Sequence, residues 1–239
     1  MHNTDILIKG LKEIGIDPSG DAVEKLFKYK DILLEWNERI NLTAIVEEKE
    51  IYIKHFLDSA TCVSTGYLKA GMSAIDVGTG AGFPGIPVKL LMSEIDLTLL
   101  DSLNKRISYL KDACSRLDIS NVELVHSRAE EAGARALYRE KYDIALSRAV
   151  APMNILMEYC LPFVKVNGYF LCQKGPNCED ELKEAQRAIK TLGGEVAEVK
   201  SFMLPFSDIK HYIIVVAKKQ NIPSKYPRKP GKPASDPII

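Results

Sequence analysis

The chain has 239 residues, of which 46% are hydrophobic, and its 32 Lys and Arg residues balance 32 Asp and Glu residues to a formal net charge of zero. This length is sufficient to bury a substantial core, and we expect one main domain with a small appendage. No apolar run approaches the ~20 residues that a helix needs to span a bilayer, so we expect no membrane insertion. Residues 1–10 lack the layout of a secretory signal, and we expect no export.

The cysteines form an odd and scattered set without CxxC spacing: Cys62, Cys114, Cys160, Cys172 and Cys178. This pattern argues against a disulfide framework and favours a reducing compartment, so we predict a cytoplasmic protein. The last three cysteines have no histidine neighbour at ligand spacing, and a structural zinc site needs four ligands. We therefore predict unligated thiols and no metal site.

Helical spacing of apolar residues marks the first part of the chain. Val23, Leu26, Phe27 and Leu33 recur at this spacing, and Ile51–Ala60 is a second stretch with an apolar face. We predict a helical extension over residues 1–66, ahead of a main domain at 67–220.

From Ser73 onward, short apolar runs alternate with longer amphipathic stretches. The predicted strands are Ala74–Val77, Leu97–Leu100, Val122–Val125, Tyr142–Leu146 and Tyr169–Gln173, and the predicted helices are Pro84–Met92, Leu103–Leu117, Ala129–Glu140, Met153–Phe163 and Glu179–Leu192. This alternation predicts a parallel sheet that is covered on both faces. Glu195–Met203 and His211–Ala217 are strands without a helix between them, which predicts an antiparallel hairpin. We thus predict an α/β fold with a doubly wound, mostly parallel seven-stranded sheet.

The end of the chain is basic and rich in proline. No acidic residue occurs from Ile209 to Ser235, and the cations there are Lys210, Lys218, Lys219, Lys225, Arg228, Lys229 and Lys232. The prolines predict a tail at 221–239 that is extended and largely without regular structure. Charge alone leaves two interpretations open, a solvated terminus and a nucleic-acid contact.

An apolar strand runs into a glycine-rich loop over Ser73–Gly85, which is typical of a nucleotide cofactor site at the first crossover of a doubly wound sheet. Gly80-x-Gly82-x-x-Gly85 also satisfies the dinucleotide pattern, with Asp101 about twenty residues on. Asp76 favours S-adenosylmethionine, because a carboxylate two residues before Gly78 can hold a cationic amino group through a water molecule or a backbone group, whereas a pyrophosphate gains nothing from it. Phe83 adds an apolar wall for adenine or a sulfonium methyl, and the terminal hairpin is typical of methyltransferase sheets.

Two further segments follow strands of the predicted sheet. Asp101 ends the second strand beside Ser102 and can accept both hydroxyls of a ribose, or else cap the next helix. Ala129 and Glu130 follow the third strand, where they can frame an adenine edge or simply begin a helix.

These segments also occur in a recognisable order. Trp36-Asn37, Asn41-Leu42-Thr43, His55-Phe56-Leu57-Asp58-Ser59, Asp76–Gly85, Leu100-Asp101-Ser102, Lys105-Arg106, Arg128-Ala129-Glu130 and Ser147-Arg148-Ala149 together resemble the glucose-inhibited division protein B family. The resemblance covers nearly the whole chain. It implies transfer of a methyl group from S-adenosylmethionine to N7 of a guanine in the 530 loop of 16S ribosomal RNA. It also implies cofactor contacts at Gly78, Phe83, Ala129, Glu130 and Arg148, and an RNA contact for the basic tail.

The ends of the predicted strands disfavour two reactions, methylation of an exocyclic amine and methylation of a pyrimidine carbon. The fourth strand ends in Ser147-Arg148 where methyltransferases that act on exocyclic amines carry an Asn/Asp-Pro-Pro-aromatic run, and Cys172 lies inside a strand, where a core thiol is favoured over a nucleophile. Guanine N7 has an in-plane lone pair and no proton, so its methylation needs no general base. Catalysis then consists of orientation, with N7 held in line about 3 Å from the methyl carbon.

We predict substrate-positioning roles for Arg148, Lys174 and His55. A cation in contact with N7 would hinder the transfer, so Arg148 is expected to one side of N7, on the methionine carboxylate, an RNA phosphate or guanine O6. The alternative is a salt bridge that closes the strand end. His55, Asp58 and Ser59 lie within one helical turn and are expected to face the cofactor mouth. The predicted RNA contacts are Arg39, Lys105, Arg106, Lys174, Lys218, Lys219, Lys225, Arg228, Lys229 and Lys232.

The predicted partner is 16S ribosomal RNA or a small-subunit particle, and a monomer is sufficient for this function. Two other functions stay open. One is a nicotinamide-dependent oxidoreductase that uses the dinucleotide register of the glycines, and the other is a ribosome-assembly factor that binds cofactor and RNA with little chemistry. Binding of S-adenosylmethionine separates the first from the proposed enzyme, and turnover on RNA separates the second.

Overall fold

The computed structural model describes residues 3–18, 20–148 and 150–239, so Ala149 of the strand-end motif lies outside the described residues. The N-terminal helices are α1 (Asn3–Glu13), α2 (Ala22–Ile40), α3 (Glu48–Ile51), the π-helical turn η1 (Tyr52–Leu57) and α4 (Asp58–Ser64). The later helices are α5 (Gly85–Leu91), α6 (Asn104–Arg116), α7 (Ala129–Ala134), α8 (Met153–Cys160), α9 (Cys178–Thr191) and α10 (Lys232–Ser235). The strands are β1 (Ser73–Val77), β2 (Asp96–Asp101), β3 (Val122–His126), β4 (Tyr142–Arg148), β5 (Val164–Lys174), β6 (Gly194–Met203) and β7 (Lys210–Lys218).

Among the described residues, seven strands form one sheet in the order β3-β2-β1-β4-β5-β7-β6. The first five strands in the chain pair in parallel, and β7 is antiparallel to both β5 and β6. The predicted fold class is therefore confirmed. The central strands are nearly continuous apolar runs, such as Leu97–Leu100 in β2, because helices cover a parallel sheet on both faces.

The chain reverses direction across the sheet at β1. From β1 it moves outward to β2 and β3, and it then returns to place β4 on the other side of β1, so that β1 pairs with both β2 and β4. In an open α/β sheet, the crevice at the carboxyl ends of the strands on either side of such a reversal is where ligands bind. The topology therefore directs attention to the ends of β1, β2 and β4.

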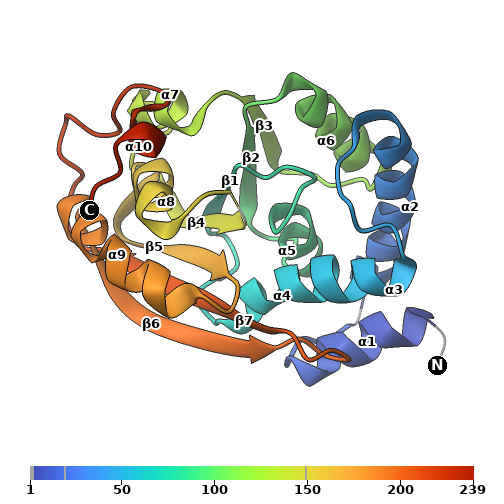
Figure 1. Cartoon of the computed structure of the whole chain (residues 1–239). Helices are drawn as coiled ribbons and strands as arrows, with labels where there is room; N and C mark the ends of the chain where they lie inside the picture. Colours follow the sequence, from blue (N-terminus) through green and yellow to red (C-terminus); the bar gives the residue numbers. More distant parts are fainter. Residues whose placement is uncertain (1–2, 19, 149) are drawn as a thin grey trace.

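Two hydrophobic clusters lie on opposite faces of the sheet, under two groups of helices (Figure 1). Helices α1 to α6 cover one face, and Leu26 of α2 and Phe56 of η1 belong to the same cluster as Leu99 of β2 and Val215 of β7. Helices α7 to α9 cover the other face. The N-terminal helices thus pack directly against the sheet that carries the glycine loop.

One of the predicted elements is wrong. The helix expected over Ala129–Glu140 ends at Ala134, because Arg135 has an extended backbone and the next residues form turns, in which Tyr138 is buried and donates to Glu123. The tail is largely without regular structure, as its prolines predict, but it contains the short helix α10 and buries Tyr226 in the second hydrophobic cluster. Proline content predicted the lack of a long helix, but an aromatic side chain and the ion pair of Arg228 with Glu158 hold the tail on the domain.

The segment predicted as a second apolar helix is continuous from α3 through η1 to α4. The π-helical turn in its middle was not predicted, and such turns are frequent at functional sites. Of the helices in the described parts of the chain, none is both long enough and apolar enough to cross a membrane.

Candidate functional site

The glycine loop between β1 and α5 adopts a backbone that side chains would disturb. Gly78 has a φ of 71°, and a Cβ added there would lie 2.8 Å from Cγ2 of Val150. Gly82 has a φ of 86°, and a Cβ there would lie 2.4 Å from the hydroxyl of Tyr29. Glycine is therefore required at both positions, and the loop backbone is left open to a ligand.

Asp76 fixes the shape of this loop. Its Oδ2 accepts hydrogen bonds from Oγ1 of Thr79 at 2.6 Å and from the backbone N of Gly85 at 2.8 Å. Burial raises the pKa of this carboxyl to about 6, although those two hydrogen bonds act in the opposite direction. Oδ1 has no hydrogen-bond partner among the described residues, and Asp76 is not among the residues that line the adjacent cavities. The carboxylate thus holds the loop backbone in place, and its action on a cationic amino group through a water molecule or a backbone group stays a prediction.

Asp101 connects the loop to the second strand. Its Oδ2 accepts from the backbone N of Gly80 at 2.9 Å and from Nη1 of Arg106 at 3.2 Å. Its Oδ1 accepts from the backbone N of Leu103, the residue that precedes α6, at 2.9 Å. The carboxylate therefore supports the helix start, as one interpretation had it, and also lines both cavities described next.

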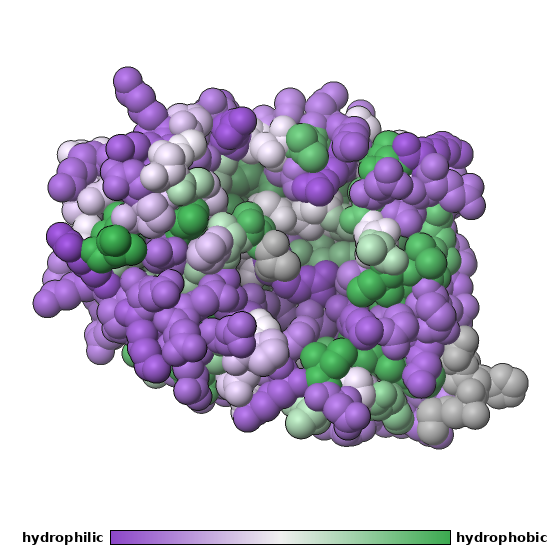
Figure 2. Space-filling view, viewed as in Figure 1, coloured by the Kyte–Doolittle hydropathy of each residue, from purple (hydrophilic) through white to green (hydrophobic). Residues whose placement is uncertain are grey.

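Two cavities meet at the carboxyl ends of β1 and β2, and Gly78, Asp101, Ser102 and Val150 line both. The first, of about 150 Å³, is also lined by Val77, Leu100, Ser127, Arg128, Ala129, Glu130 and Tyr159. The second, of about 430 Å³, is also lined by Leu42, Thr43, His55, Thr79, Gly80, Ala81, Phe83, Arg106 and Arg148. Figure 2 shows this face hollowed near its middle, with both hydrophobic and hydrophilic residues around the hollow.

The structure thus brings together most of the predicted cofactor residues. Gly78, Asp101 and Ser102 lie where the two cavities join. Ala129 and Glu130 line the first cavity, and Gly80, Phe83 and Arg148 line the second. Of the cofactor set, Asp76 alone lies outside the linings of these two cavities.

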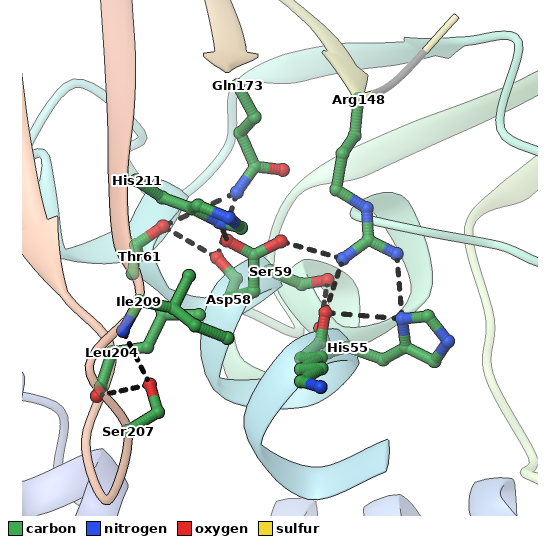
Figure 3. A network of polar contacts seen from close by, with 11 residues as sticks. His55, Asp58, Ser59, Thr61, Arg148, Gln173, Leu204, Ser207, Ile209 and His211 are labelled. Carbon is green, nitrogen blue, oxygen red and sulfur yellow. Dashed lines mark hydrogen bonds and ion pairs between the residues drawn. The ribbon is translucent and has the colours of Figure 1, made fainter. Parts of the chain in front are cut away.

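Arg148 extends from the end of β4 toward Asp58 and His55 (Figure 3). Its Nη1 lies 2.8 Å from Oδ2 of Asp58 and donates to the carbonyl of Lys54 at 3.1 Å. Its guanidinium also lies over the ring of Phe83, 4.9 Å from the centroid. The salt bridge considered as the alternative for Arg148 is therefore present, and it holds the guanidinium at the wall of the second cavity.

Asp58 is the centre of this polar network and is only 2% exposed. Besides Arg148, it binds His211 of β7, whose Nδ1 lies 2.7 Å from Oδ1. Burial raises the pKa of Asp58, but the hydrogen bonds from His211 and Arg148 outweigh burial and bring the pKa below its usual value. The carboxylate is therefore charged, and it balances the charge of Arg148.

His55 forms the other side of the same wall. Its ring stacks on Phe83 with centroids 4.5 Å apart, and its Nε2 lies 2.9 Å from Oγ1 of Thr43. Burial, together with the nearby charge of Arg148, lowers the pKa of His55 to about 4. At neutral pH the ring is therefore uncharged, and it adds no second positive charge beside Arg148.

A third cavity, of about 490 Å³, lies on the far side of this wall, because Arg148 and His55 line both it and the second cavity. Lys174 also lines it, and its Nζ donates to the carbonyl of Ala151 at 2.8 Å and to Oε2 of Glu181 at 2.6 Å. The predicted positioning set of Arg148, Lys174 and His55 is thus gathered around one cavity. The other lining residues are Ile45, Lys54, Asp58, Gln173, Gly175, Glu181, Ile209 and His211.

Gln173 and His211 in this cavity were not singled out from the sequence. Gln173 is the second-last residue of β5 and donates from Nε2 to the carbonyl of Asp58 at 2.8 Å. His211 comes from the terminal hairpin and contacts a residue 153 positions earlier in the chain. The only sequence signal for Gln173 is a polar residue near the end of an apolar strand, and His211 has no local signal at all.

The predicted RNA contacts differ in how exposed their side chains are. Lys105, Lys219, Lys225, Lys229 and Lys232 are exposed, as is Arg39, which pairs with Glu35. Arg106 is half-buried at the second cavity. Lys218 is fully buried, where it donates to the carbonyl of Leu161 at 2.8 Å, and burial lowers its pKa to about 8. The prediction of an RNA contact is therefore wrong for Lys218, because the alternation of β7 directs this side chain into the core.

All five cysteines are buried and free of disulfides. Within residues 3–18, 20–148 and 150–239, no three His, Cys, Asp or Glu side chains are grouped in a way that could hold a metal ion. Burial raises the pKa of Cys172 to about 12. This thiol therefore has none of the thiolate character that a nucleophile needs.

A family model described as rRNA small subunit methyltransferase G matches residues 22–211. The protein named Ribosomal RNA small subunit methyltransferase G from Alkaliphilus oremlandii is 57% identical over 238 residues, with 100% of both chains covered. The protein of the same name from Alkaliphilus metalliredigens is 54% identical over 238 residues, again with 100% of both chains covered.

Among solved structures, M. jannaschii TYW2 in complex with AdoMet has a TM-score of 0.52 at 12% identity, over 65% of this chain and 72% of that one. This likeness extends to the fold alone. The family match and the full-length relatives are evidence for the family as well, since they cover both the glycine loop and the Arg148 network. We conclude that the chain belongs to the rRNA small subunit methyltransferase G family.

Proposed function

We propose that this protein transfers a methyl group from S-adenosylmethionine to N7 of a guanine in the 530 loop of 16S ribosomal RNA. The observation that carries the proposal is the pair of joined cavities at the reversal point of the sheet, in a chain that belongs to a family of ribosomal RNA methyltransferases.

The lining residues fit the parts of S-adenosylmethionine. We assign the adenine to the first cavity, beside Ala129 and Glu130, and the ribose to the junction at Asp101 and Ser102. The methionine end is assigned to the second cavity, beside Gly80 and Phe83. Gly78 supports this fit, because a side chain at this position would project toward Val150 across the junction of the cavities.

When bound, S-adenosylmethionine supplies an electrophilic methyl group on its sulfonium. The lone pair of guanine N7 lies in the plane of the ring and carries no proton, so we assign no residue as a general base. The chain's task is to orient N7 toward the methyl group and to keep water out. A thiol nucleophile is disfavoured by the burial of Cys172.

Charge at the wall between the cavities is suited to this reaction. The guanine ring becomes positive when N7 is methylated, so an unbalanced cation next to N7 would oppose the transfer. Asp58 balances the charge of Arg148, and the lowered pKa of His55 keeps that ring neutral. Arg148 can then bind the methionine carboxylate, guanine O6 or a phosphate without opposing the reaction.

We assign the target guanine to the second cavity, beside Arg148 and His55, because N7 must reach the methyl group there, and Lys174 lies behind this wall in the third cavity. A base inside a folded RNA reaches such a cavity only when it is unstacked. The exposed cations Arg39, Lys105, Lys219, Lys225, Lys229 and Lys232 supply phosphate contacts. We further propose that the protein acts in the cytoplasm as a monomer, on 16S ribosomal RNA or on a small-subunit particle.

Nucleoside mass spectrometry tests the proposal. 16S RNA and small-subunit particles are purified from cells that lack this gene and are incubated with the protein and labelled S-adenosylmethionine. We expect 7-methylguanosine at a single site. No label in either substrate, from a protein that binds the cofactor, would contradict the assigned reaction and favour an assembly factor.

Two arginine substitutions control for strain in the backbone. Gly78→Arg fills the junction of the cavities and is expected to abolish both cofactor binding and methylation. Gly15 has a similar φ of 79° with open space around it, so Gly15→Arg imposes comparable strain away from the site. We expect Gly15→Arg to retain activity, and equal loss in the two variants would remove the support that Gly78 gives.

A further inference from the structure

The C-terminal segment, defined here as residues 222–236, lies against the side of the domain that carries the first cavity. Figure 1 shows α10 of this segment beside α7 and α8. Ile222 and Tyr226 are buried in the same hydrophobic cluster as residues of α8 and β5. The segment is therefore packed on the domain and is more than a carrier of positive charge.

Arg228 binds a carboxylate that is almost completely buried. Glu158 of α8 is 1% exposed, and it accepts from Nη2 of Arg228 at 2.6 Å, from Nε at 3.0 Å and from the backbone N of Arg228 at 2.7 Å. Such a multiply bonded pair is much stronger than a surface ion pair, and removing one partner leaves a buried charge unpaired. Glu158 immediately precedes Tyr159, which lines the first cavity.

A second bond from the same segment reaches a residue that lines the cavity directly. The backbone N of Gly231 donates to Oε1 of Glu130 at 2.9 Å. Glu130 is itself buried and belongs to the lining of the first cavity. One short stretch, Arg228 to Gly231, is thus bonded to both helices that form the outer wall of this cavity.

The start of the segment is held separately. Nη1 of Arg139 donates to the carbonyl of Tyr226 at 2.6 Å, and Nη2 donates to the carbonyl of Ile222 at 3.0 Å. The backbone N of Ile222 in turn donates to Oε1 of Glu140 at 2.7 Å. These contacts fix the path of the chain into the stretch that bonds Glu158 and Glu130.

We infer that Arg228 and Gly231 are positioning residues for the cofactor cavity: the C-terminal segment sets the places of Glu130 and Tyr159 and thereby raises the affinity for the adenosine part of S-adenosylmethionine. This inference rests on the proposed function, which assigns the first cavity to the adenine. It gives the basic tail a role in cofactor binding that is separate from its role in RNA contact. The exposed Lys225, Lys229 and Lys232 are left for the RNA.

The test measures cofactor affinity and RNA affinity separately in the full chain. In Arg228→Met, we expect the Kd for S-adenosylhomocysteine, measured by calorimetry, to rise about tenfold, which lies within the range found when a residue acts on a site without touching the ligand. The KM for S-adenosylmethionine should rise in parallel, and the KM for RNA should change little. Arg228→Lys keeps the charge but loses the forked geometry, so its Kd should fall between those of the wild type and Arg228→Met.

Arg187→Met is the matched control. Nη1 of Arg187 also bonds the end of the chain, donating to the carbonyl of Ile239 at 2.8 Å, but neither residue lines the first cavity. We expect wild-type affinity for this variant. If Arg228→Met proves too unstable to purify, the same measurements on Arg228→Lys decide the question, since an unchanged Kd there overturns the inference.

The outcomes distinguish the two proposals. If the wild type binds neither S-adenosylmethionine nor S-adenosylhomocysteine, the proposed function fails. If the wild type binds both and the Arg228 variants bind equally well, only the positioning role fails. A rise in the KM for RNA without a change in the Kd for S-adenosylhomocysteine would also overturn it, and would leave the segment as an RNA contact only.

Discussion

Nη1 of Arg148, at the end of β4, lies 2.8 Å from Oδ2 of Asp58, at the start of α4. This pair joins the N-terminal helices to the sheet at the wall between the second and third cavities. His211 bonds the other oxygen of Asp58, so the carboxylate has a charged or polar partner on each side. The pair therefore both anchors the helices and sets the place of the guanidinium.

Replacing Asp58 by Asn should disturb the position of the Arg148 guanidinium more than the surrounding fold. Asn keeps the size of the side chain but cannot balance the charge of Arg148, so the guanidinium should shift into the second cavity. A small misplacement of a positioning group can cost about 100-fold in rate, and we expect a fall of that order in kcat/KM. The measurement is steady-state methylation of RNA, normalised to the folded fraction. Asp143→Asn is the control, because Asp143 pairs with Lys165 near the amino-terminal ends of β4 and β5, far along β4 from Arg148. A similar fall in that variant would contradict the prediction.

The lowered pKa of His55 predicts a contribution to stability that depends on pH. The folded pKa of about 4 lies below the ordinary histidine pKa of 6.5, so the unfolded chain binds more protons between these values. The ring's contribution to the free energy of unfolding therefore grows as pH rises through this window. The size of the pKa difference corresponds to about 3 kcal/mol. The wild-type advantage over His55→Gln should therefore increase by about this amount from pH 4 to pH 7 in urea titrations. A difference between the two proteins that stays constant with pH would refute this.

Asp76 should act in the opposite sense. Its folded pKa of about 6 lies above the ordinary aspartate pKa of 3.8, so the folded chain holds the proton more tightly. The contribution of this group to stability is therefore lost as pH rises from about 4 to 6. Asp76→Asn keeps a side-chain oxygen to accept from Gly85 but does not titrate. We expect the free energy of unfolding of this variant, relative to the wild type, to increase over the same window. Parallel pH profiles for the two proteins would show that Asp76 does not titrate as its burial implies.

An added methyl group should destabilise the protein more at Gly78 than at Gly15, although both glycines have a left-handed backbone. Gly78→Ala imposes the cost of a left-handed residue, about 1–2 kcal/mol, and adds the close approach of Cβ to Val150. Gly15→Ala imposes only the first cost, because nothing lies within 4 Å of its Cβ position. Urea titration should give a larger loss of stability for Gly78→Ala, and replacing Val150 by Ala in the same chain should recover the excess. Equal losses in the two single variants would show that the contact with Val150 relaxes without cost.

The lysines of the C-terminal part of the chain should differ in their effect on RNA affinity. Lys229 is exposed, so Lys229→Met should weaken binding and reduce the slope of log K against log salt by about 1. Lys218 is buried, and Lys218→Met should leave that slope unchanged. Filter binding over a range of salt concentrations makes the comparison. A loss of slope in Lys218→Met would mean that this side chain leaves the core when RNA binds.

Local pattern in the sequence was sufficient for much of the fold and for the outline of the site. Alternation of strands and helices predicted the order of elements, and the two final strands without an intervening helix predicted the antiparallel hairpin. Gly78, Asp101 and Glu130 could be placed near one another because the carboxyl ends of parallel strands meet at one edge of a sheet. The helix after β3 was predicted too long, because its end depends on the burial of Tyr138 more than on helical propensity.

Only the tertiary structure decided which charged groups are paired and which are free. Asp58 and His211 are 153 positions apart, and Glu158 and Arg228 are 70 apart, so no periodicity along the chain relates them. The same holds for Lys218, which a count of basic residues assigns to RNA and the packing of β7 assigns to the core. Sequence by itself determined the backbone plan and the edge of the sheet where chemistry occurs, since both follow from neighbouring residues. The burial of a side chain and the identity of its partner depend on elements that are remote in the chain and meet only when it folds. The charge balance of Arg148 and the attachment of the C-terminal segment are therefore decided by the tertiary structure.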